Sequence, residues 1–280
     1  MKIEQSDLGK KAKELRKAVF KSICLAGGGH IAGSMSPIEI LEVLYNGILR
    51  IDPQNPKAPD RDRFILSKGH AGVSLYAILA EMGFFQKEEL LKFGTRGSIL
   101  GGHPDMLKVP GVEASTGSLG HGFCFGAGIA LAGKFDKKDY RVFVLLGDGE
   151  CQEGSIWETA MFAPQHKLDN LIAIIDYNKI KAIDSLDKIV SLEPLAAKWK
   201  SFGWEVKEVD GHNIAQLQKT LSRVPFVKGK PSLIIAHTIK GKGISFMENV
   251  PIWHYRLPDK EELKMACKDL GLERPQNGSS

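Results

Sequence analysis

Two uninterrupted apolar runs in the middle of the chain place the strongest constraint on its fold. They read YRVFVLLGD (140–148) and NLIAIIDYN (170–178), and both are rich in β-branched and aliphatic residues. Continuous rather than alternating hydrophobicity is typical of strands that are buried on both faces. A stretch with helical spacing, 153–166, lies between them. Strand, helix and strand in this order predict an α/β fold, a parallel sheet with helices on both faces.

The rest of the chain extends the same alternation. Further strands are expected at 63–67, 204–210 and 231–238. Helices are expected at 7–26, 36–49, 70–83 and 213–224. In the second of these helices Ser36 is the expected N-cap, and Pro37 occupies the first helical position.

Composition narrows the classes of protein to which the chain can belong. The 280 residues include 38 basic and 33 acidic side chains, without a basic block interleaved with aromatic residues, so no nucleic-acid partner is expected. The four cysteines are too widely spaced for a zinc site or a disulfide scaffold. No apolar stretch reaches the ~20 residues that a membrane span needs. We expect a cytoplasmic protein without membrane association, with one domain over 1–270 and a disordered tail over 271–280.

An acidic residue between two glycines ends the first apolar run, in LLGDGECQEG (145–154). Ligands of parallel α/β sheets bind at the carboxyl ends of the strands, where Asp148 follows one run and Asn178 closes the next. If the two strands are neighbours, their ends lie about 4.8 Å apart and both side chains can reach one Mg²⁺ that a diphosphate completes. The alternative is a tight Asp-Gly hairpin turn. The helix expected after Gly149 favours the metal site, and bare glycine amides let phosphate oxygens approach.

A second glycine-rich segment, STGSLGHGFCFGAGIALAG (115–133), passes from a loop into a helix of small residues. Loop amides and a helix N-terminus form a platform for an anion or a cofactor. Within the helix, Gly126 and Gly128 are expected to pack closely against another helix.

Five of the eight histidines directly follow a glycine, which places them in loops with open backbone. Of these we expect His30, His70 and His103 to line a pocket as hydrogen-bond donors and proton carriers. By contrast, His212 and His166 are expected at the surface.

Several motifs together resemble the transketolase family. GDGECQEGSIWETA followed by KLDNLIAIIDYNKI is similar to the thiamine diphosphate motif, a Gly-Asp-Gly with an asparagine about thirty residues later. SKGHAGVSLYAIL, GGHPD, GVEASTGSLGHG and HTIKGKGISFMEN narrow the resemblance to transketolases. The resemblance covers roughly residues 10–255 and only the N-terminal half of those enzymes. It implies the diphosphate-binding (PP-domain) fold, with thiamine diphosphate and Mg²⁺ as cofactors.

The resemblance also implies roles for individual residues. The implied magnesium ligands are Asp148, Asn178 and the carbonyl of Ile180. The implied cofactor contacts are His70, His254 and Gly149 at the diphosphate, and Gly117, Ser118 and Leu119 at the rings. The implied donors to substrate oxygens, which also assist proton transfer, are His30, His103 and His254. Glu153 matches an interface acid that hydrogen-bonds the catalytic glutamate of the partner domain.

Two positions depart from the family pattern. His121 stands where full-length members usually have glutamine, and Tyr255 follows His254 where glycine is usual.

The resemblance does not extend to the pyrimidine-binding domain, which in the family carries the catalytic glutamate and most sugar-phosphate contacts. We therefore expect a split transketolase, active only with a separate C-terminal subunit in an α2β2 heterotetramer. It would transfer a two-carbon ketol unit from a ketose phosphate to an aldose phosphate. The alternatives are another thiamine-dependent subunit, similar to deoxyxylulose-phosphate synthase or a 2-oxoacid dehydrogenase α-chain, or a non-catalytic cofactor-binding scaffold.

Overall fold

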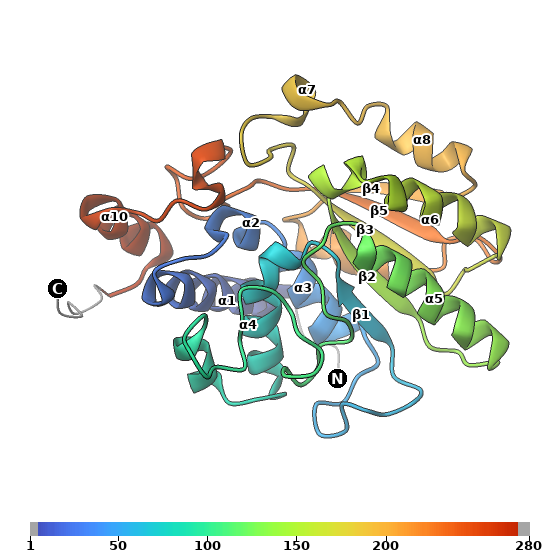
Figure 1. The fold of residues 1–280 in the computed structure, drawn as a ribbon, viewed down its shortest axis with the longest axis horizontal. Helices are drawn as coiled ribbons and strands as arrows, with labels where there is room; N and C mark the ends of the chain where they lie inside the picture. Colours follow the sequence, from blue (N-terminus) through green and yellow to red (C-terminus); the bar gives the residue numbers. More distant parts are fainter. Residues whose placement is uncertain (1–4, 274–280) are drawn as a thin grey trace.

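The computed structural model describes residues 5–273, and these have the expected α/β architecture (Figure 1). Five strands form one sheet in the order β1-β2-β3-β5-β4, and every neighbouring pair is parallel. The strands are β1 (Arg63–Leu66), β2 (Val142–Gly147), β3 (Leu171–Tyr177), β4 (Glu205–Asp210) and β5 (Ser232–His237). All five match strands expected from the sequence.

Helices cover both faces of the sheet (Figure 1). Buried side chains of β2 alternate between two cores: Phe143 and Leu145 belong to one, and Val144 and Leu146 to the other. The apolar run is uninterrupted because each face of the strand is covered. Helices of the first core are α1 (Gln5–Ala26), α2 (Ile31–Met35), α3 (Ile38–Val43), α4 (Gly72–Met82), α9 (Ile214–Leu221) and α10 (Lys260–Leu270). Helices of the second core are α5 (His121–Phe135), α6 (Gly154–Gln165), α7 (Leu186–Ile189) and α8 (Leu195–Ser201).

The second expected helix, 36–49, differs from the structure. Helix α2 begins earlier, at Ile31, and a turn at Ser36 and Pro37 separates it from α3. Ser36 has helical dihedral angles, and its hydroxyl donates a hydrogen bond of 2.6 Å to Asp176 Oδ2. The expected N-cap is therefore wrong, because a carboxylate distant in the sequence binds the hydroxyl.

The carboxyl ends of the strands bring several loops to one edge of the sheet. The loops after β1, β2, β3 and β5 begin with Ser67, Asp148, Asn178 and Thr238. The long connection between α4 and α5 returns to this edge, where Thr116 Oγ1 donates to the carbonyl of Leu66 at 2.8 Å. Segments that are far apart in the sequence therefore meet around one edge.

Helix α10 ends at Leu270, and Gly271 follows it with a left-handed φ of 63°. Most of the expected tail, 274–280, lies outside the described residues, so the domain boundary at residue 270 remains a prediction. Within residues 5–273, no helix combines the length and the apolar character needed to cross a bilayer.

Candidate active site

A cavity of about 300 Å³ lies at the carboxyl edge of the sheet. The predicted site residues that line it are His30, His70, His103, Gly117, Leu119, Asp148, Gly149, Asn178, Ile180 and His254. Ser118 and Glu153, also predicted, are exposed and are not among its lining residues. The fold thus brings most of the predicted residues together.

Asp148 and Asn178 follow two hydrogen-bonded strands, since Gly147 of β2 pairs with Asp176 of β3. Asp148 Oδ1 accepts from the Gly149 amide at 2.7 Å, and its Oδ2 accepts from the Lys179 amide at 2.5 Å. Burial, with the nearby Asp176 charge, raises the pKa of Asp148 to about 6. A carboxylate in this position gains from a cation beside it.

The oxygens at this point fit a magnesium ion that is only partly held by protein. They comprise the Asp148 carboxylate, the Asn178 amide oxygen and the Ile180 carbonyl, and all three residues line the cavity. Residues 5–273 contain no cluster of three or more His, Cys, Asp or Glu arranged to hold a metal. Magnesium typically keeps few protein ligands and takes further oxygens from phosphates and water. The donor set therefore suits a metal bound together with a diphosphate.

Two lysines that sequence reasoning missed also line the cavity. Lys240 Nζ lies 3.0 Å from Ile180 O, 2.8 Å from Lys181 O and 3.0 Å from His254 Nδ1. Burial and the charge of Lys68 lower the pKa of Lys240 to about 8. Two buried ammonium groups at one cavity favour an anionic ligand. The sequence gives little indication of their role: Lys68 is a single lysine before a glycine, and Lys240 is a single lysine before a Gly-Lys-Gly segment.

The second lysine, Lys68, is only 1% exposed and forms a buried ion pair with Asp176 of β3 at 2.5 Å. Its ammonium also donates to the carbonyl of Gly33 at 3.0 Å. The second Asp176 oxygen, Oδ1, accepts from the hydroxyl of Thr238. Burial alone would raise the pKa of Asp176, but Lys68 holds it below its ordinary value. This carboxylate therefore ties together the loops after β1 and β5 and the turn before α3.

A second buried acid, Glu150, fixes the glycine-rich loop beside the cavity. Its Oε1 accepts from Ser67 Oγ at 2.5 Å and from the Gly120 amide at 2.8 Å, and its Oε2 accepts from Gly147 N at 2.9 Å. The loops also approach closely at Gly69, where a β-carbon would lie 2.7 Å from the Gly117 amide nitrogen. Glycine at this position is therefore required sterically.

The histidines form one ring cluster at the cavity. The His30 ring centroid lies 5.4 Å from that of His70, 6.0 Å from His103 and 5.1 Å from His254. Burial and the neighbouring His103 lower the pKa of His30 to about 4, and burial and Lys240 lower that of His254 to about 3. Neutral imidazoles at pH 7 can accept a proton as well as donate a hydrogen bond.

Four other positions were singled out by the sequence. The prediction that His212 is a surface residue is wrong: its side chain is 14% exposed and bonds to Glu39. His166 is exposed, as expected, and His121 is the exposed first residue of α5. Tyr255, the other departure from the family pattern, has its ring centroid 4.9 Å from that of His30.

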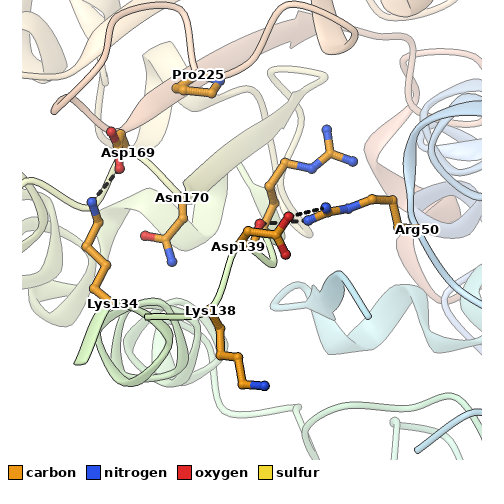
Figure 2. Close-up of a pocket in the computed structure, with 8 residues that line it drawn as sticks. Arg50, Lys134, Lys138, Asp139, Asp169, Asn170 and Pro225 are labelled. Carbon is orange, nitrogen blue, oxygen red and sulfur yellow. Dashed lines mark hydrogen bonds and ion pairs between the residues drawn. The ribbon is translucent and has the colours of Figure 1, made fainter. Parts of the chain in front are cut away.

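A larger cavity, of about 520 Å³, lies at the opposite edge, near the amino ends of β2 and β3 (Figure 2). Its charged groups are already paired: Lys134 with Asp169 at 2.5 Å and Arg50 with Asp139 at 2.9 Å (Figure 2). The smaller cavity at the carboxyl edge has the buried ammonium groups, the imidazole cluster and the metal-type oxygens. It is therefore the candidate site.

The sequence of residues 9–277 matches the family described as transketolase, thiamine diphosphate binding domain. The chain is 41% identical, over 99% of its length and all of the relative's, to one subunit of the apulose-4-phosphate transketolase of Phocaeicola vulgatus. It is 43% identical, over 98% of its length and 99% of the relative's, to 6-deoxy-6-sulfo-D-fructose transketolase subunit SqwG of a Clostridium species.

Longer transketolases match over part of their length. Human transketolase is 42% identical over 92% of this chain and 41% of its own. The crystal structure of transketolase from Campylobacter jejuni superposes with a TM-score of 0.90 at 31% identity, covering 97% of this chain and 44% of that one. The chain therefore belongs to the transketolase family, as a subunit that carries the family's thiamine diphosphate-binding domain.

Proposed function

We propose that this subunit binds Mg²⁺ and thiamine diphosphate in the carboxyl-edge cavity and acts as one half of a split transketolase. The reaction is transfer of a two-carbon ketol unit from a ketose phosphate to an aldose phosphate. The observation that carries the proposal is the convergence of Asp148, Asn178 and Ile180 on one cavity with two ammonium groups. The family match favours this enzyme over other thiamine-dependent subunits and over a non-catalytic scaffold.

In this proposal residues of several loops would anchor the diphosphate. Asp148, Asn178 and the Ile180 carbonyl hold the metal, while Lys240 and His70 face the phosphate charge. Gly149 carries no side chain to block the phosphate, and its amide, which donates to Asp148 Oδ1 in the structure, would turn to the phosphate when the cofactor binds. The loop at Gly117, Ser118 and Leu119 contacts the cofactor rings. When bound, thiamine diphosphate supplies the nucleophilic carbon to which the two-carbon unit is attached.

The histidines provide proton transfer at the mouth of the cavity. His30, His103 and His254 line the cavity, and we expect their imidazole nitrogens to reach hydroxyls of a bound sugar. Because the pKa values of His30 and His254 lie below 6.5, both rings are neutral at pH 7 and can remove a hydroxyl proton. The positive charges of Lys68 and Lys240 contribute to those low values, so a bound diphosphate should raise them.

A separate subunit is part of the proposal, because the relatives that match over nearly their whole length are named as subunits of transketolases. An exposed apolar surface on α5 and α6 supports assembly. Its residues are Phe125 (51% exposed), Phe135 (76%), Met161 (54%) and Phe162 (38%). Patches of this kind mark protein interfaces. Glu153 lies at the N-terminus of α6, which suits an interface acid, and we propose two copies of each subunit.

The substrate and the compartment are likewise proposals. Relatives of nearly the same length are named for apulose 4-phosphate and for 6-deoxy-6-sulfo-D-fructose, so unusual ketoses belong among the donors to be tested. All four cysteines are free thiols, which supports a reducing compartment and hence the cytoplasm.

Turnover assays test the proposal. The chain is assayed alone, and then mixed with a candidate subunit that carries a pyrimidine-binding domain, on a panel of ketose donors with Mg²⁺ and thiamine diphosphate. We expect ketol transfer only from the mixture, and only with both cofactors present. Robust turnover by this chain alone would overturn the split-enzyme proposal, and cofactor binding by the mixture without turnover on any donor would support a scaffold.

A further inference from the structure

A buried polar chain lies behind the cavity and is used by none of the steps above. Arg16 of α1 donates from Nη2 to both oxygens of Glu39 in α3, at 2.7 Å and 3.0 Å. Glu39 Oε2 also lies 2.9 Å from His212 Nδ1, in the loop after β4. The three side chains are 7%, 10% and 14% exposed. Burial raises the pKa of Glu39, but His212 and Arg16 outweigh it and keep this carboxyl ionised.

The backbone fixes the protonation of His212. The amide of Ile239 donates to His212 Nε2 at 2.9 Å, so this nitrogen is the acceptor and Nδ1 carries the proton. His212 therefore donates to Glu39 from Nδ1 and accepts from Ile239 at Nε2. Gly211 permits this approach, since a β-carbon there would lie 3.0 Å from His237 O and closer still to Thr238.

The residue next to Ile239 is Lys240, which lines the carboxyl-edge cavity. The same loop, 238–243, comes close to helices α2 and α1 at two more points. The Gly241 amide donates to Ala32 O at 3.0 Å, and a β-carbon on Gly243 would lie 2.6 Å from Arg16 Cδ. The loop thus contacts the Arg16–Glu39–His212 chain and, through Lys240, contributes to the cavity.

We propose that Glu39 and His212, supported by Arg16, are positioning residues that set the 238–243 loop so that the Lys240 ammonium is placed in the diphosphate site. The placement of the loop follows from the contacts above, and only its consequence for ligand binding rests on the proposed function. An apolar cluster of similar size would fill the same space, but it could not accept the Ile239 amide. Hydrogen bonding, rather than packing alone, therefore sets this loop.

The first test measures the loop itself. Hydrogen–deuterium exchange is followed in the full chain for peptides covering 238–243, in wild type, His212→Gln and His212→Phe. Glutamine retains a donor for Glu39 and an acceptor for the Ile239 amide, whereas phenylalanine retains only the ring. We expect exchange in this segment at least about tenfold faster in His212→Phe and close to wild type in His212→Gln. Equal exchange in both variants would overturn the positioning role, whatever the cofactor.

The second test measures the consequence for the cofactor. The affinity for thiamine diphosphate at fixed Mg²⁺ is determined by calorimetry, for the full chain mixed with its partner subunit. We expect His212→Phe to weaken binding about tenfold and His212→Gln to stay within about threefold of wild type. Losses of this size are typical of residues that orient the groups in direct contact with a ligand. If the wild-type protein does not bind thiamine diphosphate, the proposed function is contradicted instead. The exchange experiment would still test whether His212 positions the 238–243 loop.

Two further variants separate positioning from loss of stability. His166→Phe makes the same substitution at an exposed histidine between α6 and β3, at the amino edge of the sheet and away from the loop. It should leave the affinity unchanged. In a Lys240→Met background, His212→Phe should cause little additional loss, because two residues acting through one ammonium are not additive. Full additivity would show that His212 acts on binding by another route and would overturn the proposal.

If His212→Phe does not fold, His212→Leu or Glu39→Gln takes its place in both tests, with the same expected order relative to His212→Gln.

Discussion

At the residue scale, the buried charges decide both stability and ligand affinity. Lys68 and Asp176 are 1% and 0% exposed, so removal of one leaves the other uncompensated. We expect Lys68→Met to lower the free energy of unfolding by about 3–5 kcal/mol. Urea denaturation of the full chain without ligand measures this value.

Lys134 offers a matched control for that substitution. It pairs with Asp169 at the same distance, 2.5 Å, but the two side chains are 34% and 19% exposed. Because solvent screens such a pair, Lys134→Met should change the unfolding free energy by less than about 1 kcal/mol. Similar losses in the two variants would contradict the distinction drawn between the buried and the exposed pair.

The cavity histidines predict how stability depends on pH. The pKa of His30 is about 4 in the folded chain and near 6.5 in the unfolded chain. Between these pH values the imidazole is protonated in the unfolded chain but not in the folded chain. Stability from this group is present above pH 6.5 and is lost as the pH falls toward 4. After allowance for solvent screening the loss is on the order of 1 kcal/mol.

Replacing that ring tests the sign. Buried carboxyls change the pH dependence of stability in the opposite sense, because burial raises the pKa of Glu42 to about 7. The test therefore compares the pH dependence of stability in the variant with that in wild type. We expect His30→Asn to lose less stability than wild type between pH 6.5 and pH 4, measured by thermal unfolding. His166→Asn, at an exposed position, should follow wild type. A steeper fall in His30→Asn would contradict the account.

Sequence reasoning at this scale located residues that follow strands but missed pairs that the fold creates. Asp148, Asn178 and the histidine loops could be predicted because position after a strand or a glycine is a local property. The pairing of Lys68 with Asp176 spans 108 positions, so no local pattern reveals it. For the same reason His212 was placed at the surface, since its partner Glu39 lies 173 positions away.

At the element scale, the five strands and most helices were predictable from periodicity, while some packing partners were not. Gly126 and Gly128 were expected to contact another helix. Instead, a β-carbon on Gly126 would lie 2.5 Å from Val144 Cγ2 in β2, and one on Gly128 would meet nothing within 4 Å. The expectation is wrong because helix α5 packs Gly126 on the sheet and turns Gly128 to solvent.

These two glycines make a paired prediction. Gly126→Ala should destabilise the chain by about 1–3 kcal/mol, because the new methyl group overlaps the side chain of Val144. Gly128→Ala should stabilise it by roughly 0.5–1 kcal/mol, because alanine has a higher helix propensity than glycine at an exposed position within a helix. The midpoints of urea unfolding measure both changes, provided that the variants and wild type show the same dependence of the unfolding free energy on urea concentration. Stabilisation by both substitutions would contradict the packing of α5 on β2.

At the scale of the whole molecule, the sheet lies between two cores, and helices α5 and α6 expose apolar side chains to solvent. The parallel arrangement was predictable because both faces of β2 and β3 are apolar. The exposed apolar surface on α5 and α6 was not, since the solvent-facing side of a helix is known only when the fold is known. We expect Phe125→Glu to leave the unfolding free energy of the isolated chain within about 0.5 kcal/mol.

The same variant should weaken assembly with a partner subunit, because it places a charge in the apolar surface. Analytical ultracentrifugation of the mixed subunits measures the assembly. Leu107→Glu is the control, because Leu107 is 89% exposed in the connection between α4 and α5. Phe84 is unsuitable as a control position, because it packs against the first core. If Leu107→Glu and Phe125→Glu weaken assembly equally, the α5–α6 surface is not the interface.

The central claim is that Asp148 and Asn178, at the ends of two adjoining strands, hold one Mg²⁺ that fixes a diphosphate. Calorimetric titration of this protein, mixed with its partner, with thiamine diphosphate in the presence and absence of Mg²⁺ tests it most directly. We expect Mg²⁺-dependent binding that Asp148→Asn weakens at least about 100-fold and that Asp187→Asn, at an exposed position in α7, leaves unchanged. Wild-type affinity in Asp148→Asn, or tight binding without any divalent cation, would contradict it.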